Sequence, residues 1–186
     1  MSDALRQPSA CIPQITFMKK DNIMATKKQV EARYPYMFAG RNIGISIPRG
    51  WIGIFATLCS EIDELLGSDK QGFYWRQCKE KFGSARWYWA MKGMTSAVRI
   101  DLIAPAGVSS FTSAAKSRKP EGAALSSQLS ELIDAAADKT THSCIVCGQQ
   151  GKNDRGDGWF VVLCPEHTRM RAENRLPLIW FEEDDE

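Results

Sequence analysis

Four residues in the last third of the chain have the types and the spacing of ligands for a metal ion. Cys144 and Cys147 form a Cys-x-x-Cys pair, and Cys164 and His167 form a Cys-x-x-His pair. Zinc takes four tetrahedral ligands from thiolates and imidazoles, and structural zinc sites are commonly built from two such pairs. The sequence therefore predicts one zinc ion held by three thiolates and one imidazole. Such a site has no open coordination position, so we expect the zinc to be structural rather than catalytic.

Two alternatives to this ligand set stay open at this point. His142 lies two residues before the first cysteine and competes with His167 as the fourth ligand. We prefer His167, because it completes the second pair symmetrically. The cysteines could also be buried or free thiols beside a surface histidine, because free cysteine packs as a small hydrophobic residue.

The segments between and after the ligand pairs indicate how a small domain would position them. Gly148 follows the second cysteine and allows the backbone conformations of a tight turn. Residues 148–158 are polar and rich in turn formers, and residues 159–163 have the composition of a strand. Pro165 suits the first turn of a helix, which would carry the last two ligands on one face. A knuckle, a hairpin and a helix in this order resemble a treble-clef zinc finger.

The rest of the chain predicts an α+β fold in which helices pack on a small antiparallel sheet. Residues 51–66 are expected to form a helix that ends at Gly67, because their apolar side chains recur at helical spacing. Residues 73–91 predict a β-hairpin with its turn at Gly83-Ser84, and residues 97–104 predict a third strand. Further elements are a short helix over residues 25–33, a strand over residues 42–48 and a helical stripe over residues 125–136.

These elements divide the chain into five expected regions. Residues 105–121 are rich in Ser, Ala, Gly and Lys, which is typical of a linker, and the last five residues are all acidic. The expected regions are a flexible N-terminal extension (1–23), an α+β core (24–104), a linker (105–121), a helix plus zinc finger (122–175) and an acidic tail (176–186).

Composition favours a cytoplasmic protein. The chain has 186 residues, of which 44% are apolar, so it can bury a core. Residues 1–20 lack the apolar core of a secretory signal, and no run of apolar residues is long enough to cross a membrane. Cys11, Cys59 and Cys78 are isolated from the ligand pairs, which fits a reducing compartment better than a disulfide framework.

The predicted hairpin interleaves cations with aromatic residues. Cations bind phosphates and aromatic faces stack on bases, so one interpretation is a surface for nucleic acid or a nucleotide. The alternative is that one face packs its aromatic residues on the 51–66 helix while the other face exposes its charges to water. Near the tip, the candidate contact residues for a partner or ligand are Lys79, Lys81, Arg86 and Trp87.

Several motifs follow one another in a fixed order: Tyr34-Pro35-x-x-Phe38, Gly50-Trp51, Leu58-Cys59, Lys79-Glu80-Lys81-Phe82-Gly83-x-x-Arg86-x-Tyr88, Cys144-x-x-Cys147-Gly148, Trp159 and Leu163-Cys164-x-x-His167. In this order they resemble a family of small, functionally uncharacterised proteins from bacteriophages and prophages. The resemblance covers roughly residues 30–170 and implies the context of a phage or mobile-element accessory gene. The chain differs in having Ser84-Ala85 where the family usually has glycine and leucine, and in a longer insertion around residues 105–121.

The sequence offers few of the residues that catalysis needs, so we expect a protein that acts by binding and is not an enzyme. Both histidines lie at or beside the predicted metal site, and no nucleophile elbow, phosphate-binding loop or dinucleotide fingerprint is present. The preferred hypothesis is a phage-type accessory protein that binds a host protein stoichiometrically and inhibits host defence. The alternative is binding or sequestering of nucleic acid or a nucleotide. A zinc-finger nuclease ranks last, because it would need a further catalytic histidine.

Overall fold

The computed structural model describes residues 26–92, 98–104, 107–113 and 120–176. The predicted N-terminal extension and nearly all of the predicted acidic tail lie outside these residues. The described elements confirm an α+β fold, with four α-helices and three antiparallel two-stranded sheets. The helices are α1 (Lys27–Arg33), α2 (Ile52–Leu66), α3 (Pro120–Thr140) and α4 (Pro165–Ala172). The strands are β1 (Tyr74–Lys81), β2 (Ser84–Ala90), β3 (Val98–Ala104), β4 (Gly107–Ser113), β5 (Lys152–Asp154) and β6 (Val161–Leu163).

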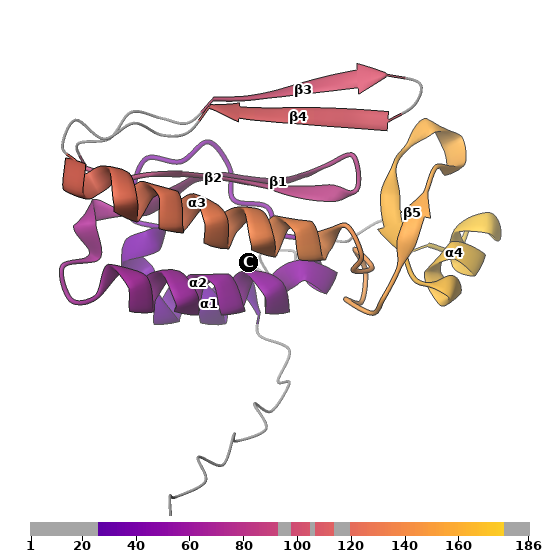
Figure 1. Cartoon of the computed structure of the whole chain (residues 1–186). Coiled ribbons are helices and arrows are strands. Elements are labelled where there is room, and N and C mark those ends of the chain that lie inside the picture. The colour runs from indigo at the N-terminus through magenta and orange to yellow at the C-terminus, as the bar shows by residue number, and fades with distance from the viewer. Residues whose placement is uncertain (1–25, 93–97, 105–106, 114–119, 177–186) are drawn as a thin grey trace, which may run out of the picture.

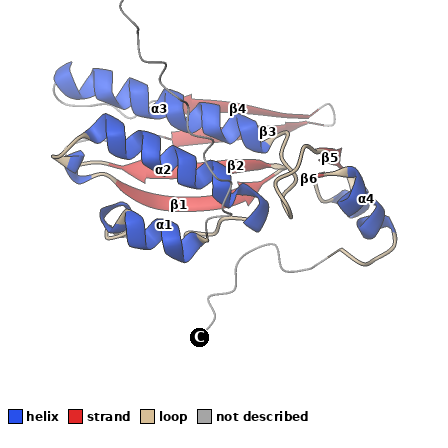
Figure 2. Ribbon diagram, turned by 90° about the horizontal axis from the view of Figure 1, so that it is seen from below, coloured by secondary structure: helices blue, strands red, loops and turns tan. Residues whose placement is uncertain are grey.

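Helix α2 is the centre of the core, as its apolar stripe predicts. A 3₁₀ turn (Arg49–Trp51) leads into it, and Gly67 ends it with a positive φ of 61°. Phe55 on this helix contacts the rings of Trp75 and Trp87 on the β1–β2 hairpin, with centroid distances of 5.2 and 5.4 Å. The aromatic face of the hairpin therefore packs on α2, and α1 and α3 flank α2 on the same side of the strands (Figure 2).

The β1–β2 hairpin turns one position earlier than the sequence predicts. Lys81 pairs with Ser84, which leaves Phe82 and Gly83 as the two turn residues. Both have positive φ, 55° and 75°, as a type I′ turn requires. The predicted turn at Gly83-Ser84 is therefore wrong. Phe82 adopts the left-handed conformation that is rare for residues other than glycine, so Ser84 is free to pair with Lys81 as the first residue of β2.

The 42–48 segment lies along the outer edge of β1. Ile45 forms a parallel bridge with Cys78, and the Cys78 amide donates to the Gly44 carbonyl at 3.0 Å. The predicted strand is therefore reduced to a short extended segment that covers part of this edge.

The predicted third strand exists but belongs to another sheet. β3 pairs with β4, so residues 107–113 form a strand where the composition predicts a linker. Ser, Thr and Gly are common in both linkers and exposed strands, which explains the error. In Figure 1 this second hairpin lies on the opposite side of β1–β2 from α2.

The long helix α3 closes the core against α2 and β2 (Figure 1). It begins at Pro120, a residue that suits the first helical turn, and buries Leu129, Ile133 and Ala136 from the predicted stripe. Its C-terminal end leads directly to the four predicted ligands. Among the described residues, none of the helices combines the length and the apolar character that a membrane span requires.

Candidate metal centre

The four predicted ligands come together at one end of the molecule. The Cys144, Cys147 and Cys164 Sγ atoms and a His167 ring nitrogen all lie within 4.8 Å of one another. Two sulfurs bound to a tetrahedral zinc at about 2.3 Å would be ~3.8 Å apart, and the Cys147 and Cys164 sulfurs are 3.8 Å apart. His167 Nδ1 lies 3.5 Å from Cys144 Sγ and 3.0 Å from Cys164 Sγ. The cluster can therefore hold one metal ion.

A tight turn and a helix start hold the two halves of the cluster. The Gly148 amide donates to the Cys144 carbonyl at 2.8 Å, and Gly148 takes the positive φ of 75° that its place after the second cysteine predicts. Cys164 caps α4, Pro165 is its first residue, and His167 follows in its first turn. The β5–β6 hairpin connects the halves, because the Ile145 amide donates to the Val162 carbonyl at 2.9 Å. The structure thus brings the expected turn, hairpin and helix together in the expected order.

His142 does not join the cluster. It is exposed, and its carbonyl accepts a hydrogen bond from the Gly151 amide at 2.8 Å. The structure therefore favours His167 as the fourth ligand over this alternative.

The thiols of the cluster differ in acidity. Burial raises the pKa of the Cys164 thiol, but hydrogen bonds from His167 and from the other two thiols lower it to about 7. Burial and the neighbouring sulfurs raise the pKa of the Cys147 thiol to about 12. A divalent cation binds thiolates, so it must displace protons from this group, and its affinity must fall as the pH falls.

Gly50 joins the first cysteine turn to the start of α2. Its amide donates to the Ile145 carbonyl at 3.0 Å. A Cβ atom at position 50 would lie 2.1 Å from the Cys144 carbonyl oxygen and 2.6 Å from the Gly148 nitrogen. Trp51 reinforces this contact, since its indole Nε1 donates to the Ser143 carbonyl at 2.9 Å. Only glycine fits at this junction without moving the cysteine turn.

We expect Gly50→Ala to destabilise the chain by roughly 1–3 kcal/mol, the usual effect of an overpacked contact. Gly53→Ala is the matched control, because a Cβ there meets nothing within 4 Å. Gly53 lies in α2, so its change to alanine should be neutral or stabilising by up to about 1 kcal/mol. Denaturant unfolding of both variants measures the difference. Equal stabilities for the two variants would contradict a close junction at Gly50.

A second junction joins the cluster region to the tip of the β1–β2 hairpin. The Phe82 and Phe160 rings meet edge to face with centroids 6.5 Å apart, and a Cβ built on Gly83 would lie 3.5 Å from a Val162 methyl group. The two turn residues of the hairpin, Phe82 and Gly83, therefore contact the segment around β6.

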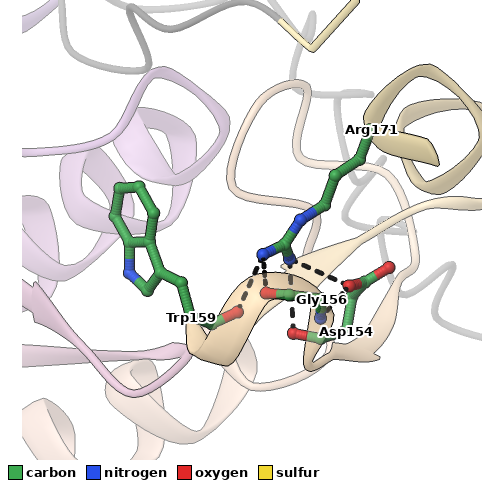
Figure 3. A network of polar contacts seen from close by, with 4 residues as sticks. All are labelled: Asp154, Gly156, Trp159 and Arg171. Carbon is green, nitrogen blue, oxygen red and sulfur yellow. Dashed lines mark hydrogen bonds and ion pairs between the residues drawn. The ribbon is translucent and has the colours of Figure 1, made fainter. Parts of the chain in front are cut away.

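Arg171 of α4 fixes the loop between β5 and β6 (Figure 3). Its guanidinium donates to the Asp154 carboxylate at 2.9 Å and to the carbonyls of Gly156 and Trp159, the latter at 3.0 Å. The same carboxylate accepts the Gly156 amide at 2.9 Å. One partly buried side chain thus holds helix and loop together, which stabilises the helix that carries His167.

The predicted contact residues at the hairpin tip do not form one exposed surface. Trp87 is only 6% exposed and packs on Phe55, so it offers little surface to a partner. Arg86 is 4% exposed and donates to the Ser84 hydroxyl and the Ala85 carbonyl. Lys79 is half-buried beside the Tyr88 ring, and Lys81 is exposed. The alternation of the strand directs tryptophan into the core and lysine away from it.

Sequence reasoning did not assign a structural role to Gly50 or to Arg171. Gly50 stands in one of the motifs of the resemblance, so a contact role could have been suspected there. No sequence signal distinguishes Arg171 from the exposed arginines Arg169 and Arg175 around it.

Comparisons with known proteins give no match for this chain among protein-family models, curated proteins or solved structures. The resemblance to phage and prophage proteins therefore rests on the sequence motifs alone.

Proposed function

We propose that this chain acts by binding a protein partner without turnover, as a phage-type accessory protein that inhibits a host defence protein in the cytoplasm. The cluster region serves as a treble-clef zinc finger with one structural zinc. Three thiolates and one imidazole are a ligand set typical of structural zinc sites, and they leave no position for a substrate. The phage context and the choice of a host partner rest on the sequence resemblance.

The observation that carries the proposal is an exposed apolar face on the β3–β4 hairpin. Ile100 and Leu102 are two residues apart on β3, so their side chains lie on the same face. Phe111 stands opposite Ile100 in the register and shares that face. These three side chains are 56–59% exposed. Large apolar side chains that are exposed and clustered on one face are typical of protein interaction sites.

This face suits a protein better than a nucleic acid. Its described side chains are apolar, whereas nucleic-acid binding needs cations for the phosphates and exposed rings for the bases. Three of the four aromatic residues that the nucleic-acid hypothesis places on the β1–β2 hairpin are buried, namely Trp75, Trp87 and Trp89. The exposure of Ile100, Leu102 and Phe111 leaves this face of the hairpin open to a partner. A partner can therefore reach this face without disturbing the core.

We expect Ile100→Ser with Phe111→Ser to abolish recovery of the partner in affinity purification from bacterial cells treated with nuclease. The control is Trp159→Ser, because Trp159 is a large apolar residue of similar exposure, 53%, outside this hairpin. Trp159→Ser should retain the partner at unchanged stoichiometry in size-exclusion chromatography. The wild-type complex should also survive high salt, since an apolar interface is not screened. Full recovery with the double variant, or loss of the complex on nuclease treatment, would contradict the proposal.

A further inference from the structure

The three cysteines of the cluster differ in how far solvent reaches them. Cys147 is partly exposed, whereas Cys144 and Cys164 are only 0% and 6% exposed. Cys147 also lines a cavity of about 550 Å³, whose described wall includes Thr57 of α2 and Lys139 of α3. A small molecule in solution therefore reaches Cys147 more readily than the other two cysteines.

Cys147 and Cys164 are placed to be oxidised as a pair. Their Sγ atoms are 3.8 Å apart. The sulfurs of a disulfide are about 2.05 Å apart, so each atom needs to move by only about 0.9 Å to form one. A bound metal ion holds both sulfurs as thiolates, which is the form that reacts with oxidants. Proximity, access and chemical form thus coincide at this pair.

The described cysteines outside the cluster are protected from oxidants. Cys59 and Cys78 lie in the core and are 0% and 1% exposed. Burial raises the pKa of the Cys59 thiol to about 12 and the pKa of the Cys78 thiol well above its usual range. Both therefore stay protonated thiols that react slowly. Cys11 lies outside the described residues.

We propose that Cys147 is a peroxide-sensitive modification site whose oxidation removes two ligands from the metal centre. The Cys147 thiolate attacks one oxygen of hydrogen peroxide, which forms a sulfenic acid and releases hydroxide. The Cys164 thiolate then attacks the sulfenic sulfur, which forms the disulfide and releases a second hydroxide. The two thiolates lose two electrons and the peroxide gains them. A thiol reductant reverses the change.

The consequence for the fold follows from the number of ligands that remain. Only Cys144 and His167 of the cluster are left to bind a metal ion after the disulfide forms. Two ligands are too few for a tetrahedral site, so the region after residue 140 should lose its metal and the stability that metal binding supplies. This consequence rests on the proposed structural zinc, whereas the disulfide itself does not.

Peroxide treatment of the purified full-length chain, followed by mass spectrometry of its proteolytic peptides, tests the disulfide. Remaining thiols are alkylated before digestion. We expect the first intramolecular disulfide to join Cys147 and Cys164, and dithiothreitol to remove it. A different partner for Cys147, earlier oxidation of Cys59 or Cys78, or no oxidation of Cys147 in millimolar peroxide would overturn the assignment.

The zinc released in the same reaction, measured with a colorimetric chelator, tests the loss of metal. We expect release of about one equivalent of zinc for each disulfide formed. Zinc that stays bound after the Cys147–Cys164 disulfide is complete overturns the proposed loss of ligands. A chain that contains no zinc before treatment contradicts the structural zinc instead, and the peptide map still decides the disulfide.

Two variants test the order of the steps. Cys164→His keeps a fourth ligand of a type common in zinc sites but cannot form the disulfide. We expect dimedone, which traps sulfenic acids, to label Cys147 in this variant and much less in the wild-type chain. Cys59→Ala is the control and should release zinc at the wild-type rate, because Cys59 is not among the grouped ligands. Absence of the label from a folded, zinc-bound Cys164→His variant overturns the order. If this variant does not bind zinc, the peptide map of the wild-type chain decides.

Discussion

Cys147→Ser is expected to unfold the region after residue 140 while α2 and the β1–β2 hairpin stay folded. Cys147 contributes one of the four ligand atoms that lie within 4.8 Å of one another. The β5–β6 hairpin and α4 are short elements, of three, three and eight residues, so they have little core of their own. In such small domains the free energy of metal binding is free energy of folding, on the order of 10 kcal/mol. Hydrogen exchange should show loss of amide protection from Cys144 to Ala172.

His142→Ala is the matched control for this prediction. His142 is exposed and lies next to the cluster, but its side chain is not among the grouped ligands. We expect its replacement to leave the metal content and the amide protection unchanged. The free energy of unfolding should change by no more than about 0.5 kcal/mol. If Cys147→Ser kept the protection of the wild-type chain, the cluster would not stabilise this region. If His142→Ala lost it instead, His142 would be the fourth ligand.

Phe55→Ala should have the second largest effect, a loss of roughly 3–5 kcal/mol in the free energy of unfolding. Phe55 is fully buried and contacts the rings of Phe38, Trp75 and Trp87 with centroid distances of 6.3, 5.2 and 5.4 Å. Its removal leaves a cavity between α2 and the hairpin that large, rigid rings cannot close. Urea unfolding followed by tryptophan fluorescence measures this loss.

Thr57→Ala, on the exposed side of α2, controls for changes in helix propensity. Its hydroxyl donates to the Gly53 carbonyl at 3.0 Å and contacts no core ring. We expect a change within about 0.5 kcal/mol for this variant. A loss below about 1 kcal/mol for Phe55→Ala would place the centre of the core elsewhere.

The features that could be predicted from the sequence are those fixed by local pattern. The stripe on α2 and the ligand spacing each depend on residues close together in the chain, and both appear where expected. The conformation of Phe82 depends on a competition between two adjacent turns, which the pattern Phe-Gly-Ser does not resolve. The strand β4 has the composition of a linker and is stabilised by its pairing with β3, which is not visible in its own residues.

The alternative interpretation of the hairpin, with its aromatic face on the 51–66 helix, predicts the burial of Trp87, but the burial of Arg86 could not be predicted because it depends on contacts between distant segments. Strand alternation places neighbouring residues on opposite faces, yet both side chains are buried. Trp87 is covered by α2, and Arg86 lies in the wall of a cavity that α3 closes. The same holds for Gly50, whose role appears only when residues 144–148 are placed against it.

The metal content of the purified full-length chain tests the central claim most directly. The protein is prepared without chelator, and zinc is measured by elemental analysis against protein concentration. The cluster of Cys144, Cys147, Cys164 and His167 predicts close to one equivalent of zinc per chain. We expect Cys147→Ser to lose it and His142→Ala to keep it. Less than about one tenth of an equivalent in the wild-type chain would contradict a structural zinc site.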